Sequence, residues 1–235
     1  MVEIQNKKIL LVVAHPDDEL LGVGATMHRL IHREHCTVKV IILGEGITSR
    51  ADSRDTSQWE KELAIHRKNI EEARQCIGFH HVITYNFPDN RFDTVALLDI
   101  IKVIEKEKVE FNPEIIFTHH GGDVNIDHQR TFEAVVTACR PLLGEVVKAI
   151  ITFETMSGTE WRASSDPRHF LPNFMVKISR EDLHAKISAM EAYEFERRPY
   201  PHPRSPEALE IRAKMWGVAN GINLAEAFQL IRNIY

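Results

Sequence analysis

Apolar and polar residues follow one another in blocks that predict strands and helices in turn. Residues 8–15, KILLVVAH, form a continuous apolar run, which is typical of a strand covered on both faces, as in a parallel sheet. A helix is expected over residues 18–35 and a second strand over residues 36–44. From Trp59 onward, apolar side chains recur at steps of three and four, which predicts a long amphipathic helix ending at Gly78.

The alternation continues through the middle of the chain. Further strands are expected over residues 81–87, 113–120 and 147–154, and helices over residues 94–108 and 128–142. Strands that alternate with helices indicate a parallel sheet with right-handed crossover connections. The sequence therefore predicts an α/β fold with a Rossmann-like, mostly parallel sheet covered by helices on both faces.

The C-terminal part, residues 180–235, is expected to be helical and to pack on the same domain. Helices are predicted over residues 181–196 and 205–221, the second opening with a serine cap and a proline in its first turn. The apolar segment INLAEAFQLIRNIY, residues 222–235, is also expected to form a helix. That helix could pack on its own domain or join copies of the chain in a homo-oligomer.

Composition narrows the class of protein. Hydrophobic residues make up 43% and charged residues 27% of the 235 residues, as in a single globular domain over residues 1–235. A net charge of −5 gives no general attraction to nucleic acid or anionic membranes. Three scattered cysteines without a CxxC pair argue against a disulfide framework. No apolar stretch is long enough for a membrane span, and we expect a cytoplasmic protein.

Polar clusters follow four of the predicted strands. They are HPDDE at residues 15–19, GEGITSR at 44–50, FPDNRFD at 87–93 and THHGGDVNIDH at 118–128. Ligands of open parallel sheets bind at the carboxyl ends of the strands. We therefore expect these four segments to meet at one edge of the sheet.

Two of these clusters contain the residue types that bind zinc. His15 and Asp18 are three residues apart across a strand-to-helix turn, and His128 begins a later helix. A catalytic zinc ion usually has three nitrogen or oxygen ligands from the protein and one open position. These three side chains would complete such a site, although a histidine or acid at a helix start is often only a solvated or capping residue.

The remaining acids suggest supporting roles. Asp17 would lie beside the metal without binding it, where a carboxylate can accept and return a proton. Asp127 could hold a histidine ring and fix its tautomer. Glu19 could support the site in the same way or simply suit the helix dipole.

The segments AHPDDE (14–19) and NIDHQRTFEAV (125–135) together resemble the LmbE-like, or PIG-L, family of zinc-dependent N-deacetylases. The resemblance spans most of the chain, and the first motif is the more specific. It implies one Zn²⁺ per chain, or another divalent metal, on the two histidines and the aspartate named above. It also implies that Asp17 is the general base and that Arg50 contacts the substrate.

One position departs from the family pattern. Many members carry a histidine where this chain has Asn125. An asparagine amide can donate a hydrogen bond to an oxyanion, but it cannot act as an acid. Asp17 would then shuttle the proton alone, or His119, His120 or His202 would assist it.

The substrate is expected to be a small amino-sugar conjugate, and nucleic acid and membranes are not expected partners. Asp89, His202 and Arg204 are further candidates for substrate binding. Arginines can pair with the phosphates of an anionic aglycone, although most surface arginines form salt bridges instead. The arginines considered are Arg50, Arg54, Arg91, Arg162, Arg197, Arg198 and Arg204. Segments 154–161 and 199–205 are expected to form the pocket walls.

The resulting expectation is hydrolysis of an N-acetyl group from an amino sugar or N-acetylglucosamine conjugate, with release of acetate and a free amine. Two alternatives remain at this point. One is a metal-dependent hydrolase of another bond, such as a phosphoester, with extra metal ligands from Asp89, Asp123 and Asp127. The other is a non-catalytic relative that binds a sugar.

Overall fold

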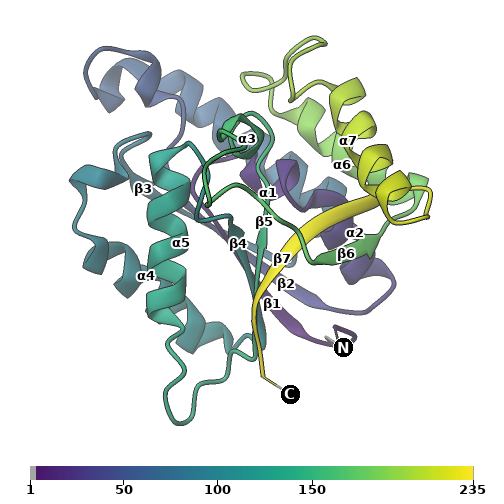
Figure 1. The fold of residues 1–235 in the computed structure, drawn as a ribbon. Helices are drawn as coiled ribbons and strands as arrows, with labels where there is room; N and C mark the ends of the chain where they lie inside the picture. The colour runs from purple at the N-terminus through teal and green to yellow at the C-terminus, as the bar shows by residue number, and fades with distance from the viewer. Residues whose placement is uncertain (1–3, 235) are drawn as a thin grey trace.

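The computed structural model describes residues 4–234 and contains a seven-stranded sheet at its centre (Figure 1). The strand order is β3-β2-β1-β4-β5-β7-β6. Strands β1 to β5 run parallel, whereas β7 is antiparallel to both β5 and β6. The strands are β1 (Lys8–Val13), β2 (Thr37–Gly44), β3 (His81–Phe87), β4 (Ile115–His119), β5 (Ala149–Phe153), β6 (Phe174–Lys177) and β7 (Ala225–Asn233). This arrangement confirms the predicted mostly parallel α/β fold.

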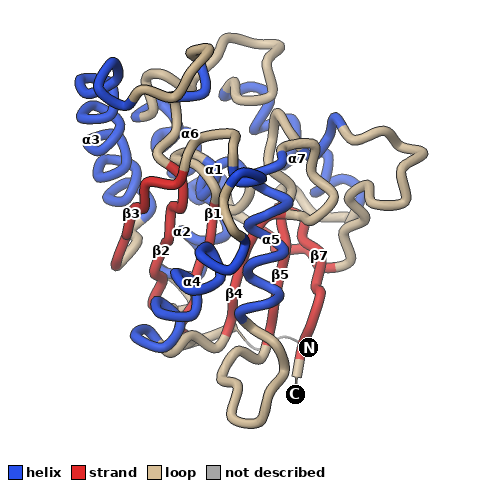
Figure 2. The backbone as a smooth tube through the Cα atoms, turned by 90° about the vertical axis from the view of Figure 1, so that its left-hand side faces the viewer, coloured by secondary structure: helices blue, strands red, loops and turns tan. Residues whose placement is uncertain are grey.

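Helices cover both faces of the sheet (Figures 1 and 2). They are α1 (Asp18–Leu21), α2 (Gly24–His32), α3 (Glu60–Ile77), α4 (Leu97–Phe111), α5 (Ile126–Ala138), α6 (Arg180–Ala192) and α7 (Pro206–Ala219). Helices α4 and α5 pack on one face, and α1, α2, α3, α6 and α7 contribute to the apolar cluster on the other. Because β1 is buried on both sides, its residues are apolar at almost every position.

The predicted helix over residues 18–35 is divided in two. Helix α1 ends at Leu21 and α2 begins at Gly24. Gly22 packs directly against Phe153, and a Cβ atom added there would lie 2.0 Å from that ring. The glycine therefore allows the helix to approach β5 closely. At the end of α3, Gly78 has a φ of +92° and caps the helix, as the sequence predicted.

The C-terminal helix predicted over residues 222–235 is wrong. Residues Ala225–Asn233 form strand β7, which fills the position between β5 and β6. Strand β6, at Phe174–Lys177, was not predicted at all. Without β7, strand β5 would leave a row of backbone groups unpaired at the edge of the sheet. This pairing overrides the local preference of Leu-, Ala- and Glu-rich sequence for a helix.

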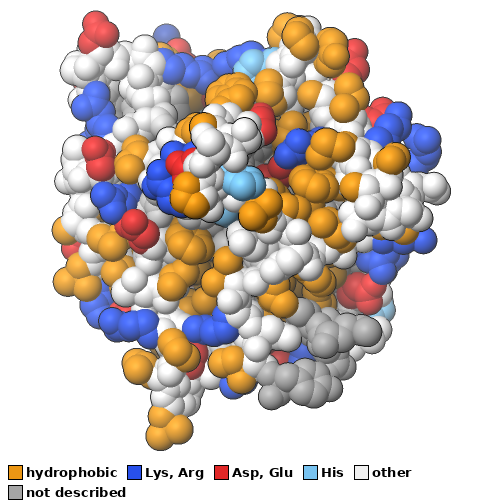
Figure 3. All heavy atoms as spheres, viewed as in Figure 1, with side chains coloured by type: hydrophobic (Ala, Val, Ile, Leu, Met, Phe, Trp, Pro, Cys, Tyr) orange, Lys and Arg blue, Asp and Glu red, His pale blue; other side chains and the backbone are white. Residues whose placement is uncertain are grey.

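The carboxyl ends of the parallel strands point to one end of the molecule, which is the upper end in Figure 2. The two described ends of the chain lie near the lower end. Charged side chains of both signs are interspersed with hydrophobic ones on the face shown in Figure 3. Within residues 4–234, no helix combines the length and apolar character needed to cross a bilayer.

Candidate metal centre and substrate cavity

A cavity of about 340 Å³ opens at the carboxyl ends of the strands. The loops after β1, β2 and β3 and the segment that leads into α5 all contribute to it, as the four polar clusters predicted. Two later segments form the remaining walls, 155–161 and the loop between α6 and α7. The charged and histidine side chains that line it are His15, Asp17, Arg50, His66, Asp89, His128, Glu196, Arg198, His202 and Arg204.

The proposed ligand atoms of His15, Asp18 and His128 all lie within 4.8 Å of one another. The Asp18 Oδ2 atom is 3.4 Å from Nδ1 of His15 and 3.3 Å from Nε2 of His128. Neighbouring ligands of a tetrahedral zinc ion are separated by about 3.3–3.5 Å, given bonds of about 2.0–2.2 Å. Both ring nitrogens of His128 are buried and form no regular hydrogen bond among the described residues, although each has a carboxylate oxygen within 3.3 Å. The donor set therefore fits a divalent metal ion.

Each of the two histidines has a carboxylate on its other ring nitrogen. Nε2 of His15 lies 2.8 Å from Oδ2 of Asp127, and Nδ1 of His128 lies 3.2 Å from Oδ2 of Asp123. The two oxygens of Asp127 also accept the backbone N–H groups of Asn90 and Phe92. Such contacts fix ring orientation and make a metal-binding imidazole more basic.

These carboxylates shape the ionisation of the cluster. Burial lowers the pKa of His128, but Asp18 and Asp123 outweigh it and raise that pKa to about 9. Burial also opposes protonation of His15, and the carboxylates of Asp127 and Asp18 still raise its pKa well above the usual value. Burial raises the pKa of Asp18, but His128 and His119 outweigh it and lower that pKa well below its usual value. A cation is favoured at this point of the structure.

His119 and His120 do not face the cavity. In His119, which is fully buried, Nε2 accepts the N–H of Ala14 and Nδ1 contacts Thr155 Oγ1 at 2.9 Å. His120 contacts the carbonyl of Arg168. The expectation that either could assist the proton transfer is therefore not supported by their positions, and His202 is the one of the three that lines the cavity.

Asp17 lies beside the metal ligands in a strained backbone conformation. Its φ is +99°, in the left-handed region that residues other than glycine rarely adopt. Its Oδ2 atom is 2.9 Å from Nη1 of Arg204. Burial raises the pKa of Asp17, and the guanidinium of Arg204 opposes that rise. The backbone N–H of Asp17 donates to Glu19, whose other oxygen accepts the Tyr193 hydroxyl. Glu19 thus supports the Asp17 loop.

Asn125 caps helix α5. Its Oδ1 accepts the N–H of Asp127, and its Nδ2 donates to Oδ1 of Asn90. An asparagine amide has two N–H donors, so one remains to be used in the cavity that Asn125 lines.

The predicted substrate residues line the same cavity and already have protein partners. Arg50 contacts Glu196, and Arg204 Nη1 lies 2.5 Å from the other oxygen of Glu196. Asp89 accepts the N–H of Ser49 and lies 3.3 Å from His15 Nε2, so it also orients this histidine. His202 accepts the N–H of Arg204.

Two residues of the site had no assigned role in the sequence prediction. Glu196 joins Arg50 and Arg204, and nothing in its local sequence distinguishes it from other acids after a helix. His66 is 2% exposed, lines the cavity and stacks on Phe195. It was predicted on the apolar face of α3, which is where it lies.

A second cluster of possible ligands consists of His15, Asp89 and Asp127. It uses the Nε2 side of His15. Carboxylate oxygens of both clusters accept backbone N–H groups, since Asp18 Oδ2 accepts that of His15 and the Asp127 oxygens accept those of Asn90 and Phe92. The first cluster fits a metal better because it includes His128, whose buried ring nitrogens form no regular hydrogen bond among the described residues.

The chain is similar in sequence to known proteins of one family. Residues 10–139 match the profile of the GlcNAc-PI de-N-acetylase (PIG-L) family. The chain is 26% identical over 196 residues to the uncharacterized deacetylase YaiS of Escherichia coli strain K12, covering 80% of this chain and 91% of YaiS.

Solved structures show the same fold. The N,N'-diacetylchitobiose deacetylase from Pyrococcus horikoshii has a TM-score of 0.75 and 20% identity, over 98% of this chain and 87% of that one. The zinc-inhibited form of teicoplanin deacetylase Orf2 has a TM-score of 0.75 and 16% identity, over 96% and 98% of the two chains.

Proposed function

Because the chain belongs to the GlcNAc-PI de-N-acetylase (PIG-L) family, we propose that it removes an N-acetyl group from an amino sugar or N-acetylglucosamine conjugate. The reaction is a hydrolysis that releases acetate and a free amine. We propose Zn²⁺, one per chain, as the metal.

One observation carries the proposal. Three possible ligand atoms that lie within 4.8 Å of one another stand beside a carboxylate, that of Asp17, which is not needed as a ligand. A metal site with three protein ligands and a separate proton acceptor is the arrangement that amide hydrolysis requires. A non-catalytic sugar-binding protein would not need Asp17 in a strained conformation at this place.

Each side chain of the site has a separate role in the proposed reaction. A divalent metal held by His15, Asp18 and His128 would polarise the acetyl carbonyl and make the attacking water more acidic. Asp17 accepts the proton of that water and delivers it to the leaving amine. The free N–H of Asn125 donates to the oxyanion of the tetrahedral intermediate. Glu19 and Asp127 hold the base and a metal-binding histidine in place.

The proposed substrate site is completed by four further side chains that line the cavity, Arg50, Asp89, His202 and Arg204.

A phosphoesterase with two metals would need the second cluster of ligands. That cluster shares His15 with the first site and lacks His128, whose buried ring nitrogens form no regular hydrogen bond among the described residues. This observation favours the deacetylase. The three unpaired cysteines are consistent with our proposal of a cytoplasmic enzyme.

The test is acetate release by the zinc-loaded protein. The substrates are N-acetylglucosamine, N,N'-diacetylchitobiose, UDP-N-acetylglucosamine and a malate-linked N-acetylglucosamine. We expect release from at least one, no release by the Asp17→Asn variant, and full activity of Asp93→Asn, an exposed acid outside the cavity.

Zinc content is measured on every variant. Asp17→Asn should retain its metal, and loss of the metal would contradict the role of Asp17 as a base. A protein that holds one zinc ion and releases acetate from none of the conjugates would contradict the deacetylase proposal.

A further inference from the structure

Three guanidinium groups line the cavity, those of Arg50, Arg198 and Arg204. Two of these guanidinium groups form ion pairs with the same carboxylate, that of Glu196. Glu196 contacts Arg50 through Oε1 and Arg204 through Oε2, and Arg204 also contacts Asp17 at 2.9 Å. These two arginines are therefore already paired with acids of the protein.

Arg198 has no carboxylate within salt-bridge distance anywhere in the described part of the chain. Its Nη1 donates to the backbone carbonyls of Phe195 and Arg197, at 2.8 and 2.9 Å. Those two bonds hold the guanidinium against its own loop and leave its positive charge uncompensated. The side chain is half-buried in the cavity wall, where a charge is screened less than on an open surface.

The other arginines that the sequence suggested for an anion are excluded by position or by partners. Arg54 pairs with Glu45, and Arg162 contacts Asp166 and donates to two backbone carbonyls. Arg197 lies 3.6 Å from Glu191. Arg91 does not line the cavity. Among the seven, Arg198 is the one that both lines the cavity and lacks an acidic partner within residues 4–234.

The charge of Arg198 acts inside the cavity. Burial lowers the pKa of His202, and the positive charges of Arg204 and Arg198 lower it further. All three side chains come from the loop between α6 and α7, which also places Glu196 in the cavity. Because Glu196 pairs with Arg204, the charge of Arg198 is the one that this loop leaves without an acidic partner among the described residues. Lys and Arg side chains also lie along the upper edge of the molecule in Figure 3, the end at which the parallel strands stop.

We propose that the substrate carries an anionic group, a phosphate or a carboxylate, on the part attached to the amino sugar, and that Arg198 binds this group. A guanidinium presents two parallel N–H donors that match the oxygens of either group. Nε and Nη2 of Arg198 are the donors left for it, since Nη1 is used by the loop. The inference rests on the proposed function and adds the charge class of the substrate.

The test compares three substrates that differ in the group on C1 of N-acetylglucosamine. They are the 1-phosphate, the malate conjugate and the neutral methyl glycoside, and acetate release gives kcat and KM for each. In the wild type we expect a lower KM for one or both anionic substrates than for the neutral glycoside. In Arg198→Ala that KM should rise by about 10- to 100-fold, with kcat nearly unchanged, because hydrogen bonds to a charged group are lost.

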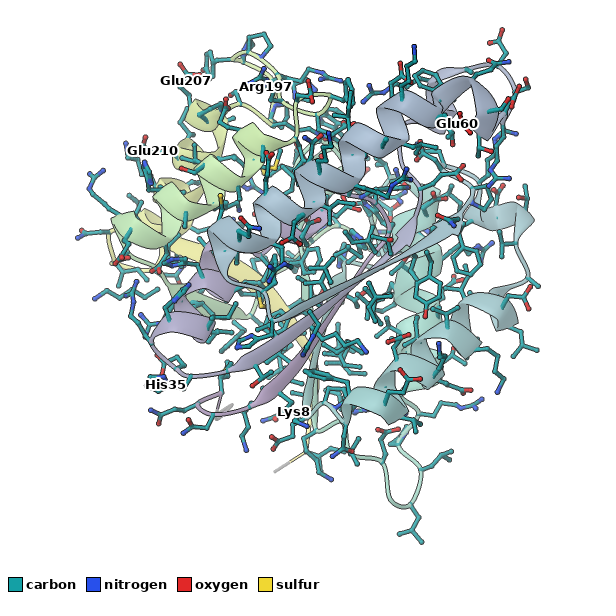
Figure 4. All side chains as sticks on the ribbon, turned by 180° about the vertical axis from the view of Figure 1, so that it is seen from behind. Lys8, His35, Glu60, Arg197, Glu207 and Glu210 are labelled. Atoms are coloured by element: carbon teal, nitrogen blue, oxygen red, sulfur yellow. The ribbon has the colours of Figure 1, made fainter. Side chains whose placement is uncertain are left out.

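Arg197→Ala is the matched control. It removes the same charge one residue away, from an exposed side chain that does not line the cavity. Figure 4 labels Arg197 at the upper end of the molecule, opposite Lys8 at the start of β1. We expect Arg197→Ala to change KM for any of the three substrates by less than twofold. The phosphate and malate arms decide which anion is preferred.

The Arg198→Lys variant tests whether an effect of Arg198→Ala comes from the lost charge or from a changed loop conformation. It keeps the charge and should recover part of the preference for the anionic substrates. An equal rise of KM for the neutral glycoside in Arg198→Ala, or a wild type without preference for an anion, would overturn the inference.

Binding of the reaction products gives a readout that does not need turnover. Glucosamine 1-phosphate and methyl glucosaminide are titrated calorimetrically into the zinc-loaded wild type and Arg198→Ala. Tighter binding of the phosphate that depends on Arg198 supports the inference even if no acetate is ever released. Acetate release with no dependence on charge would leave the deacetylase standing and remove the role of Arg198.

Discussion

At the scale of single residues, the metal site is a set of paired charges. Asp18 lies between His15 and His128, and Asp127 and Asp123 hold the far sides of the two rings. These three carboxyl and two imidazole groups would be costly to bury unless each is matched by an opposite charge. A divalent cation provides that match, and the orienting carboxylates decide how tightly it is held.

Removal of the carboxylate behind His15 should weaken metal binding. In Asp127→Asn the amide still accepts a backbone N–H but no longer carries a charge for the imidazole to contact. We expect zinc affinity to fall by about 10- to 100-fold, as for other such partners of metal-binding histidines. Competition with a chromogenic chelator measures it. Asp93→Asn is the control, and equal affinities for both variants would contradict the role of Asp127.

Metal binding should release protons. Without metal, the pKa of His128 is about 9, so that this ring is protonated at pH 7, and the pKa of His15 is raised in the same direction by Asp127 and Asp18. A metal binds the neutral imidazole, so at least one proton should leave at pH 7 and fewer as the pH rises through 9. Zinc affinity therefore increases with pH over this range. Calorimetric titration in two buffers of different ionisation enthalpy counts the protons, and a count of zero would contradict this electrostatic description.

At the scale of elements, the C-terminal strand completes the sheet. β7 pairs with β5 over Ala149–Phe153 and with β6 over Phe174–Lys177. Phe228 of β7 is fully buried and packs on Phe117 with ring centroids 5.6 Å apart. Ile231 lies where the pairing with β5 shifts register, and its side chain is 41% exposed. The strand is thus buried over Ala225–Phe228 and more open to solvent toward its C-terminal end.

Truncation of Phe228 and of Ile231 to alanine should change the free energy of unfolding by different amounts. We expect Phe228→Ala to lower the free energy of unfolding by about 3–5 kcal/mol, because it removes a buried ring and leaves a cavity. Ile231→Ala should cost less than about 1 kcal/mol, since its side chain is already partly in water. Urea denaturation of both variants measures the difference. Similar losses at both positions would argue against the strand.

At the scale of the whole molecule, the proposed metal ligands come from distant parts of the chain. His15 and Asp18 belong to the β1–α1 turn, whereas His128 belongs to α5, more than a hundred residues later. A metal site formed by both segments exists only in the folded state. The free energy of metal binding therefore adds to the free energy of unfolding. The cavity walls come from later segments still, including the loop between α6 and α7.

Metal should therefore raise the melting temperature. Zinc at a hundred times its dissociation constant adds about 2.7 kcal/mol, which corresponds to a shift on the order of 5–10 °C for a chain of this size. Differential scanning fluorimetry with and without chelator gives the shift. His128→Gln should fold but show little of it. A shift that persists in this variant would mean that zinc stabilises the protein at another place.

The sequence by itself determined the elements whose pattern is local. The apolar run of β1, the glycine that ends α3, and the serine and proline that open α7 are all where the pattern predicted them. The resemblance of HPDDE and NIDH to the deacetylase motifs also depended on short segments. Such features are readable because their physical causes act within a few residues.

Only the tertiary structure decided the features that depend on distant partners. The strand at Ala225–Asn233 exists because β5 and β6 offer it hydrogen bonds, not because of its own propensity. The structure also separated Arg198, which lacks an acidic partner, from Arg50 and Arg204, which share Glu196. The sequence does not show which arginines form ion pairs. Ion pairing depends on distances between charged groups, which are set by the fold and not by the order of residues.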